Sequence, residues 1–338
     1  MKKWLVLSGG GSKGAFQAGV LTKLKELEPD LEYDGFAGIS VGALNSATLS
    51  QGNLSQGLEI AHDIWFKKIK GNKSVWTHKL FKRLGISVSI ILLLFIILHV
   101  LMLFSVIPTI VYVVLISLFI LSFGLLFLVL FTTKSIYSSK PLQKLVYNNY
   151  KPQKTKDAGK RLIVGAVSWK TGKYESVDNS KDNIKDWILA SSAFPLFLDS
   201  IKINNLCYTD GGIRDIAPLW DAIKAGATDI DIILASPLAE SEIDEILPNL
   251  FSQLMRTINI MSNEILRNDL VEFLKLYPDL NIRIFMPEKS LTSNSLSFDP
   301  KLLRYMYEEG CKMASKPITP QEVYDIVSGY KRPFITKC

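Results

Sequence analysis

The sequence predicts an α/β fold, with a mostly parallel sheet covered by helices on both faces and interrupted by a two-helix transmembrane hairpin. Three observations lead to this prediction. Apolar runs that suit buried strands alternate with segments of helical spacing, a glycine-rich loop joins the first such pair, and residues 86–131 contain no Asp, Glu, Lys or Arg. We therefore divide the chain into a first part of one large domain, residues 1–85, the hairpin, and a second part, residues 132–338.

The first strand and the first helix are joined by the glycine-rich loop. Residues 4–7 are an apolar run, and apolar residues recur at helical spacing from Phe16 to Leu27. The loop between them comprises Gly9, Gly10, Gly11, Ser12, Lys13 and Gly14. Its backbone N–H groups and the helix dipole would favour an anion, either a nucleotide phosphate or the oxyanion of a tetrahedral intermediate. The spacing Gly9, Gly11, Gly14 matches a dinucleotide fingerprint in form, but the acidic residue expected at the end of the next strand is absent.

The second strand, residues 33–37, leads into a Gly-x-Ser-x-Gly pattern. Gly38, Ser40 and Gly42 form this pattern, and small residues that tolerate a helix follow it. Such a pattern places a serine on a tight, strained turn between a strand and a helix, where its hydroxyl is accessible. Ser40 is therefore a candidate nucleophile, although glycine and serine are also common in ordinary turns.

A candidate base for this serine follows a later strand. Residues 206–209 suit a strand, and Asp210, Gly211 and Gly212 come directly after it. A serine hydroxyl needs a proton acceptor, and the three histidines of the chain, at positions 62, 78 and 99, all precede residue 100. The order Ser, acid, His of the α/β-hydrolases is thus impossible, and a Ser–Asp dyad is the economical interpretation.

The three motifs, in this order, resemble the patatin-like phospholipases. Segments 190–195 and 298–314 are also similar to members of that family, so the resemblance covers residues 1–60 and about 160–316. It implies a patatin-like catalytic domain in which Ser40 is the nucleophile, Asp210 the proton acceptor, and residues 9–14 the oxyanion hole. Lys13 would help to orient this loop, unless it is an ordinary solvated lysine. The resemblance implies a lipid ester as substrate, and it requires no metal and no cofactor.

The apolar stretch reads as two membrane spans, residues 86–104 and 109–131. A spanning helix needs about 20 apolar residues, and Pro108 lies in the break between the two segments. A buried hairpin of a soluble domain is one alternative, and one long re-entrant segment is another. Residues 60–85 and 134–161 together carry fifteen Lys and Arg against two Asp, so we expect both flanks, both termini and the catalytic domain on the cytoplasmic side of a membrane. An even number of spans also lets Ser40 and Asp210 meet.

The basic flanks also suggest a partner. They would attract an anionic membrane surface, with about 1 kcal/mol for each basic residue near it, although membrane topology alone explains them equally well. Nucleic-acid binding is not predicted, because these residues border an apolar hairpin instead of alternating with recognition motifs.

The remaining segments predict further elements of the domain. We expect a polar surface loop at residues 171–186, strands at 230–237 and 281–287, and helices between 247 and 276. The sequence as a whole predicts a membrane-anchored serine acyl hydrolase of the lipase or phospholipase A type. Two alternatives stay open, a non-catalytic membrane scaffold with a degenerate hydrolase fold and a nucleotide-binding membrane protein.

Overall fold

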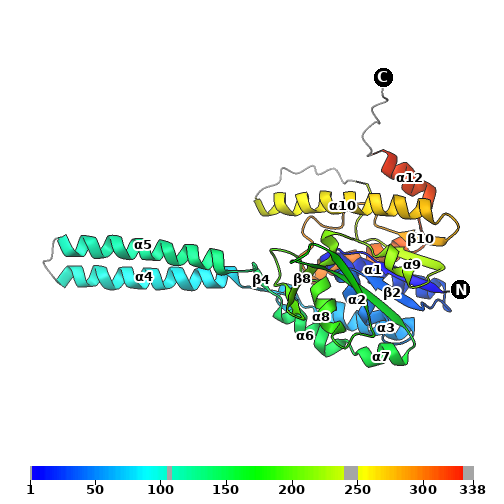
Figure 1. The fold of residues 1–338 in the computed structure, drawn as a ribbon, viewed down its shortest axis with the longest axis horizontal. Coiled ribbons are helices and arrows are strands. Elements are labelled where there is room, and N and C mark those ends of the chain that lie inside the picture. The colour runs from blue at the N-terminus through cyan, green and yellow to red at the C-terminus, as the bar shows by residue number, and fades with distance from the viewer. Residues whose placement is uncertain (1, 105–108, 240–249, 330–338) are drawn as a thin grey trace, which may run out of the picture.

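The centre of the protein is a mixed sheet. The computed structural model describes residues 2–104, 109–239 and 250–329, and within these ranges the sheet has eight strands (Figure 1). Five neighbours are parallel, in the order β10 (Asn281–Phe285), β9 (Asp229–Ile233), β1 (Lys3–Leu7), β2 (Gly35–Gly38) and β5 (Arg161–Ser168). Three strands are antiparallel: β6 (Tyr174–Asp178) and β8 (Leu206–Asp210) pair with β5, and β7 (Ile201–Ile203) pairs with β8. The prediction of a mostly parallel sheet is confirmed.

Helices cover both faces of this sheet. Successive residues of a strand point to opposite sides, and here both sets are apolar, so each face is buried under helices. In β1, Leu5 and Leu7 belong to one apolar cluster, whereas Trp4 and Val6 belong to the other. The first cluster packs against α1 (Gly14–Leu27), α2 (Val41–Leu49), α3 (Leu54–His62), α8 (Ile184–Ser191) and α11 (Pro300–Met313). The second packs against α9 (Leu219–Lys224), α10 (Leu250–Leu276) and α12 (Pro320–Ser328). Strands buried on both faces account for the continuous apolar runs of the sequence.

Shorter elements complete the domain. They are the 3₁₀ turns η1 (Gly11–Lys13), η3 (Asn72–Ser74) and η4 (Gly211–Ile213), a π-helix η2 (Asp63–Lys68), and the helices α6 (Lys140–Asn149) and α7 (Pro152–Asp157). The predicted surface loop at 171–186 is wrong in part, since it contains β6 and the first residues of α8. The polar side chains of β6, which made this segment resemble a loop in the sequence, form hydrogen bonds with helix α9. Tyr174 and Ser176 donate hydrogen bonds of 2.7 and 2.8 Å to the carboxylate of Asp221.

The register of the sheet brings the motifs to one edge. β1 and β2 are parallel, so the glycine loop after Leu7 and the turn after Gly38 leave the sheet at the same edge. Gly38 pairs with Val164 of β5, and Asp210 of the antiparallel β8 pairs with Ala166, two residues further along. Asp210 therefore lies just beyond the end of β2, at the level of the turn.

Two long helices interrupt the domain between β2 and β5. α4 (Leu80–Phe104) and α5 (Thr109–Thr132) lie side by side and project away from the sheet (Figure 1). At their base β3 (Thr77–His78) pairs with β4 (Tyr137–Ser138). Many of their described side chains are apolar and exposed, up to 75 % for Phe131.

Helices thus occupy both predicted spans, residues 86–104 and 109–131, and α4 begins before the first of them. Its predicted turn, residues 105–108, lies outside the described residues. Judged on the described residues alone, no helix combines the length and the apolar character of a membrane span. Crossing of a membrane by this pair stays a prediction.

Candidate active site

Ser40 occupies the turn between β2 and α2, in a strained backbone conformation. Its φ of 55° and ψ of −124° are rare for any residue but glycine, and such strain is found mostly where function requires it. The turn is also tight. A β-carbon on Gly42 would lie 2.2 Å from the carbonyl oxygen of Leu7, and one on Gly38 would lie 2.3 Å from that of Gly42. The two glycines of the motif are therefore required by close approach of the backbone.

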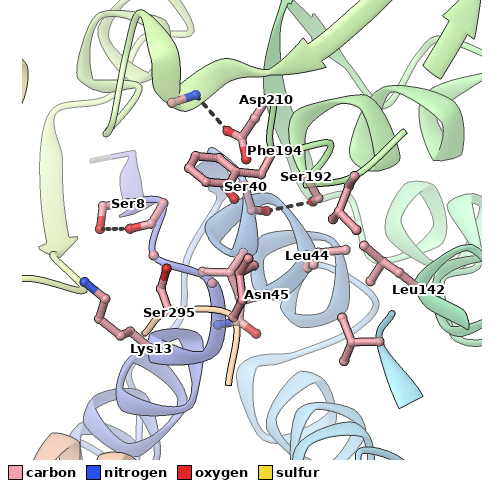
Figure 2. A pocket seen from close by; sticks show the side chains of 18 of the residues that line it. Ser8, Lys13, Ser40, Leu44, Asn45, Leu142, Ser192, Phe194, Asp210 and Ser295 are labelled. Carbon is pink, nitrogen blue, oxygen red and sulfur yellow. Dashed lines mark hydrogen bonds between the residues drawn. The ribbon is translucent and has the colours of Figure 1, made fainter. Parts of the chain in front are cut away.

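Two serines at the end of α8 hold this turn, and the sequence did not single them out for this role. The backbone N–H of Ser40 donates to Ser191 Oγ at 3.0 Å. Ser192 Oγ donates to the carbonyl oxygen of Ser40 at 3.1 Å, the bond drawn in Figure 2. Both polar groups of the strained residue's backbone are thus fixed by side chains from a different part of the chain.

Asp210 lies at the end of β8 with its carboxylate directed toward the turn. It is 2 % exposed, and Oδ1 accepts the backbone N–H of Gly212 at 2.8 Å. Figure 2 shows the carboxylate above Ser40, beside the ring of Phe194. Among the described residues, Oδ2 has no partner in normal hydrogen-bond geometry. The Ser40 hydroxyl is near enough to influence the carboxylate as a donor, and catalytic hydrogen bonds are often long before substrate binds.

Burial sets the proton affinity of this carboxylate. Loss of solvent raises the pKa of Asp210 to about 7, against the opposing effects of the Ser40 hydroxyl and the Gly212 N–H. A carboxylate with a pKa near neutrality can accept a proton from a hydroxyl and return it later in a reaction.

The glycine loop lies against Ser40, and most of its N–H groups are already bonded. A β-carbon on Gly9 would come within 3.3 Å of Ser40 Cβ. The N–H groups of Gly9, Ser12, Lys13 and Gly14 all donate to carbonyl oxygens of the protein. Within the described part of the chain, those of Gly10 and Gly11 have no acceptor. The six predicted oxyanion residues thus contain two whose N–H groups have no acceptor among the residues that the structure describes.

Gly11 has a conformation that favours glycine. Its φ is 58°, and a β-carbon there would lie 2.2 Å from the carbonyl oxygen of Ser295. The same carbonyl accepts the Ser12 N–H at 2.7 Å. Ser295 therefore shapes the loop, although no sequence pattern links it to the N-terminus.

Lys13 is buried, so the interpretation of a solvated surface lysine is wrong. It is 4 % exposed and lines the cavity, and Nζ donates to Ser236 Oγ at 2.6 Å. Burial lowers the pKa of Lys13 to about 8. None of the ion pairs formed between described residues includes it.

These groups surround one end of a cavity of about 180 Å³. Much of the remaining wall is apolar and includes residues of α2, η2 and α6, and we call this apolar part of the wall the apolar arm. The side chains of this arm include Leu44, Ile64, Trp65, Leu142, Val146 and Tyr150. His62 and His78 are not part of the cavity wall. His62 Nε2 contacts Thr22 and Tyr307 instead, and the His78 ring packs edge-on against Trp76. Across the described ranges, no group of three His, Cys, Asp or Glu side chains is placed to hold a metal ion.

Comparison with known proteins identifies the family. The family model described as patatin-like phospholipase matches residues 5–223. Curated proteins give no match. Among solved structures, VipD from Legionella pneumophila is similar with a TM-score of 0.45 and 14 % identity, over 96 % of this chain and 67 % of VipD. Because the family model covers well over half of the chain, including the Ser40 turn and the Asp210 motif, this protein belongs to the patatin-like phospholipase family.

Proposed function

We propose that the protein is a serine acyl hydrolase that cleaves lipid acyl esters with a Ser40–Asp210 dyad. Membership of a lipid acyl hydrolase family supports the reaction class. The observation that carries the assignment of residues is the buried Asp210, whose Oδ2 has no partner among the described residues and faces a serine held on a strained turn. Burial raises the pKa of Asp210 to about 7, which suits a base that acts near neutral pH.

The reaction follows from the positions of these groups. Asp210 takes the proton of the Ser40 hydroxyl as Oγ attacks the ester carbonyl, and the carbonyl oxygen becomes an oxyanion. The N–H groups of Gly10 and Gly11 bind that oxyanion, and one such donor typically contributes about 10²–10³ in rate. Asp210 then gives the proton to the leaving alcohol, and an acyl-enzyme forms on Ser40. Water, deprotonated by the same carboxylate, attacks the acyl carbonyl, the bond to Ser40 Oγ breaks, and Oγ takes the proton back from Asp210 as the fatty acid leaves.

The apolar arm supports an acyl chain as the part of the substrate that is bound. The wall includes residues of α2 from Val41 to Thr48, and the chain from Ser40 to Thr48 rises about 12 Å over eight residues at about 1.5 Å each. Its walls are aliphatic and aromatic, as is usual for apolar ligands. Nucleotide binding at the glycine loop is less well supported, because four of the six N–H groups there already have acceptors.

We also propose that the α4–α5 hairpin holds the domain at a membrane as a two-span anchor, with the basic flanks toward anionic lipid and the domain on the cytoplasmic side. The exposed apolar side chains of both helices support this. The walls of the cavity support it too. Val75 and Trp76 directly precede β3, and Leu142 closely follows β4, so part of the cavity wall lies where the hairpin leaves the domain. A membrane-bound hairpin would therefore hold the cavity next to its lipid substrate.

Hydrolysis of phospholipid vesicles tests this function. The protein should release fatty acid from vesicles of zwitterionic and anionic phospholipid, and Ser40→Ala and Asp210→Asn should each remove almost all of this activity. The matched control replaces His62, His78 and His99 together by alanine and should keep most of it. If the triple-histidine variant is as inactive as Asp210→Asn, the dyad assignment fails. Full activity of Ser40→Ala would exclude the proposed reaction at this site.

A further inference from the structure

A series of buried hydrogen bonds joins the helix that carries the nucleophile to both ends of the glycine loop. Trp65 Nε1 donates to Asn45 Oδ1 at 3.0 Å. Asn45 Nδ2 donates to Gln17 Oε1 at 2.9 Å and to the carbonyl oxygen of Gly14 at 3.0 Å. Gln17 Nε2 donates to the carbonyl oxygen of Ser8 at 2.8 Å. Asn45 is 5 % exposed and Gln17 is fully buried.

The direction of this series is fixed by its two ends. An indole nitrogen can only donate, so Asn45 must present its oxygen to Trp65 and its NH₂ group to Gln17 and Gly14. A backbone carbonyl can only accept, so Gln17 must present its NH₂ group to Ser8 and its oxygen to Asn45. Each amide therefore has one orientation in which all these bonds form. The side chains fix one relative placement of three separate segments.

The three segments are the parts that the proposed reaction must align. Ser8 directly precedes the loop that contains Gly10 and Gly11, and Gly14 ends it. Asn45 lies on α2, in whose first turn Val41 follows the nucleophile. The end of the glycine loop packs tightly against α2, since a β-carbon on Gly14 would lie 2.3 Å from Val41 Cγ2 and 3.2 Å from Asn45 Nδ2. Figure 2 shows Asn45 below Ser40, between α2 and the loop.

We infer that Asn45 and Gln17 are positioning residues, which hold the oxyanion donors of the glycine loop at the correct distance from Ser40. This inference rests on the proposed function. Neither side chain takes part in the proposed chemistry. Both hold the glycine loop in place, and a displacement of about 1 Å in a reacting group can lower the rate about 10²-fold. The series also reaches the substrate. Trp65 forms part of the apolar arm and lies in the π-helix η2, a kind of distortion that is frequent at functional sites.

The test compares Asn45→Ala and Gln17→Met with a matched control, Asn179→Ala. Asn179 is also a buried asparagine that bridges backbone groups, as it accepts from the Leu162 N–H and donates to the Lys160 carbonyl. It is not part of the cavity wall. Gln17→Met keeps the volume and removes only hydrogen bonds, so it provides a folded variant even if Asn45→Ala is unstable. Each variant is measured for thermal unfolding, for kcat and KM on a soluble short-chain ester, and for inhibition by an alkyl boronic acid that mimics the tetrahedral intermediate.

We expect kcat to fall about 10²-fold in Asn45→Ala and in Gln17→Met, with little change in KM. Boronic acid affinity should fall by a similar factor. The double variant should be about as active as the worse single variant, because both act on one loop. Asn179→Ala should lose stability and keep its kcat. A kcat in both site variants that matches the control would overturn the positioning role. Hydrolysis that survives in Ser40→Ala would instead overturn the proposed function itself.

Discussion

The hydroxyl of Ser40 faces Oδ2 of Asp210, the carboxylate oxygen that lacks a normal hydrogen bond among the described residues, while Oδ1 is held by the Gly212 N–H at 2.8 Å. One oxygen therefore fixes the orientation of the carboxylate, and the other is left for the serine. In a Ser-His-Asp triad these two tasks belong to different residues. In the proposed dyad, burial of Asp210 would supply the proton affinity that a histidine provides in the triad.

The pH dependence of hydrolysis should report Asp210. Burial raises the pKa of Asp210 to about 7, and only its ionised form can act as base, so kcat/KM on a soluble ester should increase with pH and level off above about 7. Asp215 provides the control, since burial and Asp221 raise its pKa to about 7 as well, but it is not part of the cavity wall. Asp215→Asn should leave the midpoint unchanged. A midpoint near pH 4, or one that moves in Asp215→Asn, would contradict the assignment.

The same pKa predicts an effect on stability. The folded-state pKa of Asp210 lies above its ordinary value of 3.8, so folding favours the protonated form. This contribution is complete below about pH 4 and is lost as the pH increases to about 7, at about 1.4 kcal/mol for each unit between the two pKa values. Asp210→Asn, which cannot ionise, should therefore be more stable than the natural protein at pH 8 and gain little at pH 4. Equal unfolding temperatures of the two proteins at pH 8 would show that burial does not destabilise the charged carboxylate of Asp210.

The backbone of Ser40 predicts a difference between two inactive variants. A φ of 55° is unfavourable for alanine and acceptable for glycine, so Ser40→Gly should unfold at a higher temperature than Ser40→Ala, by roughly 1 kcal/mol or more of unfolding free energy. Thermal or denaturant unfolding of both proteins measures this. Equal stability would mean that the turn is not strained in solution.

The glycine loop predicts a loss of activity that is separate from strain. Gly11→Ala places a β-carbon 2.2 Å from the Ser295 carbonyl oxygen, which must displace one of the two free N–H groups. We expect kcat to fall about 10²–10³-fold. Gly172→Ala is the matched control, because Gly172 has a similar φ of 66° but no atom near its β-position. It should cost stability alone, and equal kcat values for the two variants would exclude Gly11 from the oxyanion site.

The hairpin predicts a separation of substrate access from chemistry. Replacing residues 86–131 by a short linker should give a protein that still hydrolyses a soluble ester, because β1, β2 and β8 and their loops lie outside this segment. It should lose membrane retention and most of its activity on vesicles. Membrane retention that is unchanged after the deletion would show that the hairpin is not the main anchor.

Local patterns predicted the residues whose chemistry depends on their own turn. Gly38, Ser40 and Gly42 are adjacent in the chain and define a turn by themselves, and Asp210 is placed by the strand before it. The pairs that tune the site could not be predicted in this way. Ser191 and Ser192 with Ser40, Ser295 with Gly11, and Trp65 with Asn45 each meet only through packing of distant segments.

Burial and pairing also explain the differences in the fold. A solvated surface position is one of the two interpretations of Lys13, because lysine is rarely buried, yet its side chain is buried and donates to Ser236. β6 reads as a loop because its side chains are polar, and their acceptor, Asp221, lies on α9. In both cases the missing information is the partner in space, which no local pattern contains.

Covalent capture of the nucleophile is the most direct test of the Ser40–Asp210 dyad. The protein is treated with a fluorophosphonate and digested, and the modified peptide is identified by mass spectrometry. The adduct should be on Ser40, should be absent in Ser40→Ala, and should form far more slowly in Asp210→Asn. The triple replacement of His62, His78 and His99 should be labelled at close to the natural rate. An adduct on another serine, or labelling that persists in Ser40→Ala, would contradict the account.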